Sequence, residues 1–121
     1  MEETVVQIEW EGPKTLDQIA DLNNPQTDVG VYAIYGPHVL YGGYTLVYIG
    51  KTWDGFGRRI LRPDHPGVQA DARTKTKVHI GRLQDAAEDV FKRRAMIQEA
   101  ESLLIYAHAP AYIQPRIIKG T

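Results

Sequence analysis

The stretch VGVYAIYGPHVLYGGYTLVYIG, residues 29–50, decides the expected fold more than any other part of the chain. Its two ends are rich in β-branched and aromatic residues, so we expect strands over 29–35 and 46–50. Gly36-Pro37 and Gly42-Gly43 lie between them, and such pairs are typical of turns. The stretch therefore predicts a hairpin of two antiparallel strands joined by a long loop, residues 36–45.

The segments on either side of this hairpin supply the remaining elements. Residues 4–10 alternate between polar and apolar side chains, as in a strand, and we expect Glu11-Gly12-Pro13 to end it. Thr15 is a suitable N-cap for a helix that runs to about Leu22. The C-terminal half predicts a short helix over 56–62, a strand over 76–83 and a long helix over 86–108, uninterrupted by glycine or proline.

These elements predict an α/β fold of the α+β kind, with one domain in 121 residues. We expect a small central antiparallel three-stranded sheet, formed by residues 29–35, 46–50 and 76–83 and flanked by helices. The long helix should pack across this sheet. Two places remain open for the N-terminal strand, at the edge of the sheet or outside it.

Composition excludes several classes of protein and of site. The chain has no cysteine, which excludes disulfides, thiolate metal sites and thiol nucleophiles, so a metal ion would need oxygen or imidazole ligands. There is no run of eighteen apolar residues, and Met1 to Trp10 is acidic where a secretory leader would be basic and then apolar. We therefore expect a cytoplasmic protein that does not bind membranes.

Charge is distributed unevenly along the chain. The net charge is −1, but residues 1–50 hold one basic and seven acidic side chains, whereas residues 51–95 hold eleven basic and six acidic ones. A basic middle segment suits contact with a polyanion such as nucleic acid. A solvated surface rich in salt bridges would have the same composition, so charge alone leaves both interpretations open.

Glu101 stands out in the long predicted helix because it lies on the apolar stripe. It comes four residues after Ile97, and Leu104 and Ile105 follow it three and four residues later; Val90 and Phe91 are the other members. A buried, ionised carboxylate is costly unless it is hydrogen-bonded, paired with a base or bound to a cation. Two interpretations therefore remain, a structural bridge to an arginine and a metal ligand.

Tyrosines are concentrated in the hairpin. Five of the seven lie on or between its strands: Tyr32, Tyr35, Tyr41, Tyr44 and Tyr48. Most tyrosines in strands serve packing. Tyr32 and Tyr48 differ because each lies two residues from a glycine, Gly30 or Gly50, where the missing side chain lets a backbone or a ligand approach the phenol.

A basic run follows directly after Gly50 and comprises Lys51, Arg58, Arg59 and Arg62. A solvated helix face is one interpretation of this run. Contact with a phosphoryl transition state is another, because the guanidinium group suits the spread charge of that state.

In content and in order, these features resemble the GIY-YIG nuclease family. The chain has Gly30-Val31-Tyr32 on one strand, Tyr48-Ile49-Gly50-Lys51 on the next, then an arginine helix, then a glutamate in a long helix. The resemblance spans Gly30 to about Ile113, roughly two-thirds of the chain. It implies a nuclease-like domain over 29–121, with residues 1–28 as an N-terminal strand–helix extension of one compact unit.

The resemblance implies a metal-dependent endonuclease that hydrolyses phosphodiester bonds in nucleic acid, with DNA as the expected target. Tyr32 and Tyr48 match the two signature tyrosines, which would position or deprotonate the attacking water. Arg59, three residues after Phe56, matches the arginine that steadies charge on the phosphate, assisted by Lys51. If the family spacing is counted from Gly50 without an insertion, the matching arginine is Arg58 instead.

Glu101 matches the family's metal-binding glutamate, since Leu104-Ile105 and then Pro110 follow it as in the family pattern. The resemblance implies one Mg²⁺ or Mn²⁺ ion on this carboxylate, with the rest of its shell from water and phosphate. Substrate contacts are expected at Gly30, Gly50, Arg58, Arg62 and His65. His79 is a further candidate histidine.

One position departs from the family pattern. Ile113 occupies the place in which the family usually has asparagine, and its side chain cannot form a hydrogen bond; Gln114 is the nearest substitute. The alternative hypothesis is therefore a catalytically weakened or inactive relative that acts as a nucleic-acid-binding or protein-interaction module. A protein partner or a homodimer is compatible with both hypotheses, because so small a chain has little room for a separate reader domain.

Overall fold

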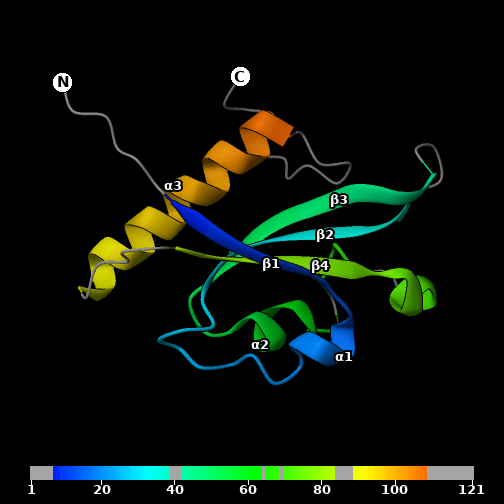
Figure 1. The fold of residues 1–121 in the computed structure, drawn as a ribbon, viewed down its shortest axis with the longest axis horizontal. Helices are drawn as coiled ribbons and strands as arrows, with labels where there is room; N and C mark the ends of the chain where they lie inside the picture. The colour runs from blue at the N-terminus through cyan, green and yellow to red at the C-terminus, as the bar shows by residue number, and fades with distance from the viewer. Residues whose placement is uncertain (1–6, 39–41, 64, 69, 84–88, 109–121) are drawn as a thin grey trace.

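A computed structural model describes residues 7–38, 42–63, 65–68, 70–83 and 89–108 of the chain. Figure 1 shows its elements, which follow the order β1 (Ile8–Lys14), α1 (Leu16–Ile19), β2 (Gly30–His38), β3 (Gly42–Thr52), α2 (Phe56–Ile60), the 3-10 helix η1 (Ala70–Lys75), β4 (Lys77–Leu83) and α3 (Val90–His108). The α+β class expected from the sequence is confirmed.

The sheet has four strands in the order β1-β4-β2-β3, and every neighbouring pair is antiparallel. The three strands predicted from the sequence are adjacent in it, but the predicted number is wrong. β1 pairs with β4 at one edge of the sheet and so adds a fourth strand. Of the two places open to the N-terminal strand, it therefore takes the sheet edge.

Two Gly-Pro pairs that were expected to end strands lie inside them instead. Gly12-Pro13 is part of β1, where the register shifts between Glu11 and Lys14, and Gly36-Pro37 is part of β2. Proline lacks the N–H that a ladder needs, but β1 is an edge strand, and the pairing of β2 with β4 stops at Tyr35. The predicted loop over 36–45 is accordingly shorter, and residues 39–41 lie outside the described residues.

The short helices begin where the sequence indicates and end earlier. The Thr15 side chain accepts a hydrogen bond from the Gln18 N–H, and the Gln18 side chain accepts one from the Thr15 N–H, so the predicted cap is confirmed. α1 then ends at Ile19 rather than at about Leu22, and α2 ends at Ile60 rather than at Arg62.

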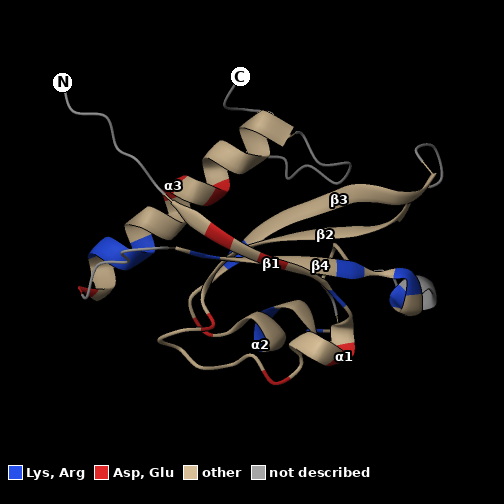
Figure 2. Ribbon diagram, in the orientation of Figure 1, with Lys and Arg blue, Asp and Glu red and all other residues tan. Residues whose placement is uncertain are grey.

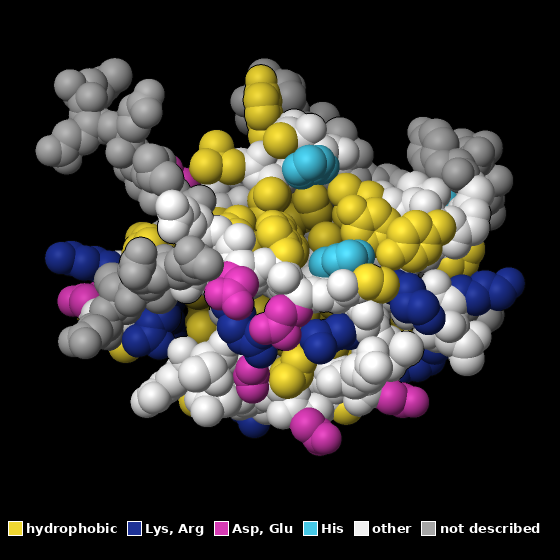
Figure 3. Space-filling model, in the orientation of Figure 1, with side chains coloured by type: hydrophobic (Ala, Val, Ile, Leu, Met, Phe, Trp, Pro, Cys, Tyr) yellow, Lys and Arg dark blue, Asp and Glu magenta, His cyan; other side chains and the backbone are white. Residues whose placement is uncertain are grey.

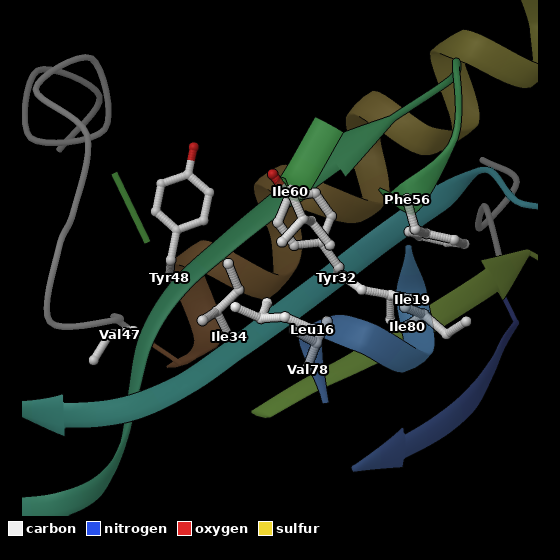
Figure 4. Packing of buried hydrophobic residues seen from close by; sticks show 10 residues of the cluster. All are labelled: Leu16, Ile19, Tyr32, Ile34, Val47, Tyr48, Phe56, Ile60, Val78 and Ile80. Carbon is white, nitrogen blue, oxygen red and sulfur yellow. The ribbon is translucent and has the colours of Figure 1, made fainter. Parts of the chain in front are cut away.

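Helices cover both faces of the sheet, α1 and α2 one face and α3 the other (Figure 1). Figure 4 shows the larger apolar cluster on the α1/α2 face, which consists of Leu16, Ile19, Tyr32, Ile34, Val47, Tyr48, Phe56, Ile60, Val78 and Ile80. Alternation along β4 places Val78 and Ile80 on this face and leaves His79 for the other. Two smaller clusters join α3 to its face through Ile97, Ala100 and Ile105.

The first turns of α3 differ from the expectation. Ile97 and Ile105 of the predicted stripe are buried, but Val90 and Phe91 are 51% and 81% exposed. These two residues lie at the end of α3 that extends past the sheet, where no strand covers them (Figure 1). The helical period was therefore read correctly, but the length of helix that the sheet covers was overestimated.

None of the described helices is long and apolar enough to cross a membrane.

Candidate active site

Tyr32 lies in the middle of the sheet, and its phenol passes across the edge strand β3. It is paired with Gly50, and a Cβ atom at Gly50 would lie only 2.5 Å from the Tyr32 hydroxyl oxygen and 2.8 Å from the Tyr48 ring. Any side chain at this position would displace one of the two tyrosines. The glycine is therefore what allows both rings to reach the same place. Tyr32 meets it across the two strands, and Tyr48 meets it from two residues away on the same strand.

Tyr32 and Tyr48 come together on the α1/α2 face of the sheet. Their ring centroids lie 6.2 Å apart with an angle of 25° between the planes. In Figure 4 both rings point the same way, with their hydroxyl oxygens directed away from Leu16 and Val78. The two signature tyrosines thus present their polar ends side by side, above an apolar floor.

His65 completes this group, although the sequence offered it only as a substrate contact. It is 6% exposed, and its Nε2 lies 2.7 Å from the Tyr32 hydroxyl oxygen. The Gly67 N–H donates to Nδ1 at 3.0 Å, so Nδ1 carries no proton. We therefore assign the proton to Nε2, which donates it to the phenol oxygen, and the imidazole is neutral.

Arg59 is the arginine of α2 that turns toward Tyr32, whereas Arg58 and Arg62 are exposed. Its Nε is buried and has no hydrogen-bond partner among the described residues. Asn23 accepts from the Arg58 N–H at 2.6 Å, which fixes the start of α2. Of the two arginines that the sequence left open, the structure thus brings Arg59 to the tyrosines.

The phenol of Tyr32 holds its proton tightly. Burial raises the pKa of Tyr32 well above its usual value, and the neighbouring Tyr48 and Glu101 raise it further, while the charge of Arg59 and a hydrogen bond to Arg59 act in the opposite direction. Tyr32 is therefore protonated at neutral pH. This state disfavours Tyr32 as the general base and suits it to orienting a water molecule.

Lys51 and Glu101 form an ion pair on the opposite face of β3, under α3. The Lys51 Nζ lies 2.9 Å from Oε1 of Glu101, and their side chains are 17% and 4% exposed. The burial of the Glu101 carboxylate on the apolar stripe is confirmed. Of the two interpretations left open, the structural bridge is formed here with a lysine in place of an arginine. Since consecutive strand residues point to opposite faces, Gly50 and Lys51 place the tyrosines and the ion pair on the two sides of one edge strand.

A cleft of about 250 Å³ joins the two sides and is lined by Lys51, Thr52, Trp53, Asp54 and Arg59. Two cations that come from different elements therefore face the same space. The Trp53 ring lies between Lys51 and Arg94, at 5.8 Å and 5.2 Å from its centroid. Arg94 belongs to the basic first turns of α3 (Figure 2).

Sequence reasoning missed Thr52 and Trp53. The Thr52 hydroxyl accepts from the N–H groups of Asp54 and Gly55, which turns the chain from β3 into α2 and so aims Arg59. A threonine two residues before an Asp-Gly pair was a usable turn signal. No comparable sequence pattern indicates a role for Trp53, a single tryptophan that follows a strand.

The remaining predicted site residues lie elsewhere or outside the described residues. Gly30 faces the carbonyl oxygen of Gly81, with which a Cβ would collide, so its place is explained by the close approach of β2 and β4. His79 lies on the α3 face against Tyr35, away from the tyrosine pair. Ile113, Gln114 and Tyr41 lie outside the described residues.

Glu101 is the carboxylate by which this site would hold a divalent ion. Within the described part of the chain, no group of three or more His, Asp or Glu side chains is arranged around a common metal position. A single buried carboxylate fits Mg²⁺ or Mn²⁺ if water and substrate phosphate complete the shell. The donor chemistry is therefore suitable for an ion shared with the substrate, in competition with Lys51 for Glu101.

Comparison with known proteins found no protein-family model, no curated protein and no solved structure that matches this chain.

Proposed function

We propose that this chain is a metal-dependent endonuclease of the GIY-YIG type, which hydrolyses phosphodiester bonds in nucleic acid, with DNA as the expected target. One observation carries the proposal. Four separate elements bring the predicted residues to one strand of the sheet: Tyr32 on β2, Tyr48 and Lys51 on β3, Arg59 on α2 and Glu101 on α3. Packing alone does not require that this set meet.

The two cations of the cleft would bind the scissile phosphate. Lys51 and Arg59 line the same space of about 250 Å³, which admits a phosphodiester group. The Arg59 guanidinium would stabilise the charge that develops on the phosphate. Its Nε, which has no partner within the described chain, is buried from solvent.

The tyrosines would position the attacking water. The Tyr32 oxygen accepts a hydrogen bond from His65, so its own proton points elsewhere and can be donated to a water or a phosphate oxygen. Tyr48, whose ring lies beside it, is the tyrosine left to accept the water's proton. His65 acts as a positioning residue that fixes the direction of the Tyr32 hydroxyl.

A bound Mg²⁺ or Mn²⁺ would act as a Lewis acid on the phosphate and its leaving oxygen. Glu101 would hold this ion, and Lys51, which contacts the same carboxylate, would turn toward the substrate.

The test is nicking of a supercoiled plasmid in the presence of Mg²⁺, Mn²⁺ or a chelator. Wild type should nick only with metal, Glu101→Gln should be inactive, and Glu99→Gln, an exposed carboxylate of the same helix, should retain activity. Arg59→Ala should lower kcat by about a hundredfold or more, as loss of a transition-state donor does. Arg58→Ala, one residue away but exposed, is the matched control.

The second candidate function is a nucleic-acid-binding or protein-interaction module on the same scaffold. It is favoured by the Lys51–Glu101 pair, which already neutralises the carboxylate, and by Ile113 in place of asparagine. Inactive wild type together with an active Ile113→Asn variant would show a disabled site on an intact scaffold, as this function requires. Inactivity of both proteins would contradict the nuclease proposal for this substrate.

A further inference from the structure

α3 leaves part of its sheet face uncovered, and a groove of about 250 Å³ lies there. Figure 3 shows it as an apolar hollow with histidine side chains at its rim. All four strands and α3 contribute to its lining, which includes Trp10, Tyr35, Leu46, His79, Leu104 and His108.

Flat aromatic rings lie at one end of this groove, where Tyr44, outside the lining itself, stacks on the lining residue Tyr35. Tyr35 and Tyr44 are stacked, with centroids 5.1 Å apart and 14° between their planes, and His79 meets Tyr35 edge-on at 5.3 Å. Tyr44 is 57% exposed and Trp10 is 43% exposed, so solvent reaches both rings. Exposed rings beside an apolar hollow are the usual platform for an unstacked nucleobase.

Two lysines lie on the same face of the sheet as the groove, although neither is part of its lining. Lys51 is paired with Val31 and Lys77 with Tyr35, so β2 runs between them. Four residues of strand separate the two pairs, about 13 Å, which is the length of about four stacked nucleotides. Lys51 already pairs with Glu101, and none of the described lining residues is a carboxylate. Lys77 is therefore the cation that this face offers to a phosphate backbone.

The groove lies near the Lys51–Glu101 pair of the candidate active site. Ile49 in its lining precedes Lys51 by two residues of β3, and Leu104 follows Glu101 by less than one turn of α3. These spacings correspond to about 7 Å along the strand and about 5 Å along the helix. A phosphate held by Lys51 and Arg59 would therefore place the base of a neighbouring nucleotide in the groove.

We infer that the chain binds an unpaired strand of nucleic acid, whose bases stack in this aromatic groove next to the scissile phosphate. The inference rests on the proposed function and names its substrate class, nucleic acid with a single-stranded portion. Paired bases would not suffice, because in a duplex each base already stacks on its neighbours and shows only its edge.

The experiment measures binding without cleavage, by fluorescence anisotropy in chelator. Three labelled probes of about ten nucleotides are used: a single strand, the blunt duplex of the same sequence, and a strand with the same phosphates but abasic sugars. The single strand should bind at least about tenfold more tightly than either of the other two, because stacking on aromatic side chains contributes affinity that phosphates cannot. Binding should also quench the fluorescence of Trp10.

Variants locate this binding in the groove. Tyr44→Ala and Trp10→Ala should each weaken single-strand binding by about tenfold and leave abasic binding unchanged. Tyr106→Ala, an 83% exposed tyrosine outside the groove lining, is the matched control. Because more than half of the Tyr44 ring is in solvent, that variant should fold even if Trp10→Ala does not. Lys77→Ala should weaken the binding of both single-stranded probes and reduce their salt dependence.

Equal affinity for the single strand and the abasic strand would overturn the inference, and so would unchanged binding by Tyr44→Ala. A chain that sediments as a dimer in wild type and as a monomer in Tyr44→Ala, with unchanged oligonucleotide affinity, would show that a second copy covers the groove. Groove-dependent binding without any plasmid nicking would retain the inference and contradict the proposed function. Nicking without groove-dependent binding would contradict the inference and leave the proposed function standing.

Discussion

The Tyr32 hydroxyl oxygen and Nε2 of His65 lie 2.7 Å apart inside the protein, although 33 positions separate the two residues in sequence. Because the Gly67 N–H already donates to Nδ1 of the same ring, the histidine can act toward the phenol only as a donor. This contact determines how the buried tyrosine is held.

His65 should be neutral, with its proton on Nε2. ¹⁵N NMR of the imidazole should report this tautomer at neutral pH, and a proton on Nδ1 would contradict the assignment. His65→Ala should lower the free energy of unfolding by about 1 to 3 kcal/mol, because the buried phenol oxygen loses its donor. His79→Ala, on the other face of the sheet, should leave plasmid nicking unchanged.

Stability should depend on the protonation of Tyr32 in alkaline solution. Burial raises its pKa above the ordinary value of about 10, so between about pH 10 and pH 11 the unfolded chain loses the proton that the folded chain keeps. The unfolded state then binds fewer protons, and the free energy of unfolding falls as pH rises, whereas below about pH 10 this contribution is fully present.

Urea denaturation of wild type and Tyr32→Phe at several pH values measures this effect. The stability of wild type relative to the variant should fall by about 1 kcal/mol between pH 10 and pH 11. A difference that does not change with pH would mean that the Tyr32 phenol ionises equally in the folded and unfolded chain.

Gly50→Ala should disrupt the tyrosine pair. The added methyl group would come within 2.5 Å of the Tyr32 phenol, which cannot move freely in a packed core. We expect a loss of about 1 to 3 kcal/mol in the free energy of unfolding and a loss of nicking activity. The control is Gly43→Ala on the same strand, where no atom lies within 4 Å of the added carbon. Equal effects of the two substitutions would show that β3 tolerates a side chain at Gly50.

Lys51→Met should destabilise the protein by about 3 kcal/mol or more, because it removes the cation that forms an ion pair with the buried Glu101 carboxylate. Lys14→Met breaks a more exposed pair, 3.9 Å from Glu11, and should cost less than about 1 kcal/mol.

Mn²⁺ then distinguishes a metal ligand from a structural carboxylate. If Glu101 binds metal, Mn²⁺ should raise the melting temperature of Lys51→Met more than that of wild type, since the ion replaces the missing cation. It should not stabilise Glu101→Ala. Absence of a shift in all three proteins would assign Glu101 a purely structural role.

The sequence predicted most elements because their signals are local. The capping box at Thr15, the alternation of Val78 and Ile80 and the uninterrupted helix before His108 each depend on a few neighbouring residues. The errors arose where distant pairing overrides such signals. Gly36-Pro37 has the composition of a turn, yet it continues β2 beyond Tyr35 because β3 still pairs with it there.

For the candidate site, the residue types were already visible in the sequence: two tyrosines beside glycines, an arginine helix and a carboxylate on an apolar stripe. Only the tertiary structure decided that Arg59 rather than Arg58 faces the tyrosines, that Lys51 is the partner of Glu101 and that His65 holds Tyr32. Such contacts join residues tens of positions apart. They depend on strand register and on how helices pack across a sheet, and no local pattern of residues encodes either.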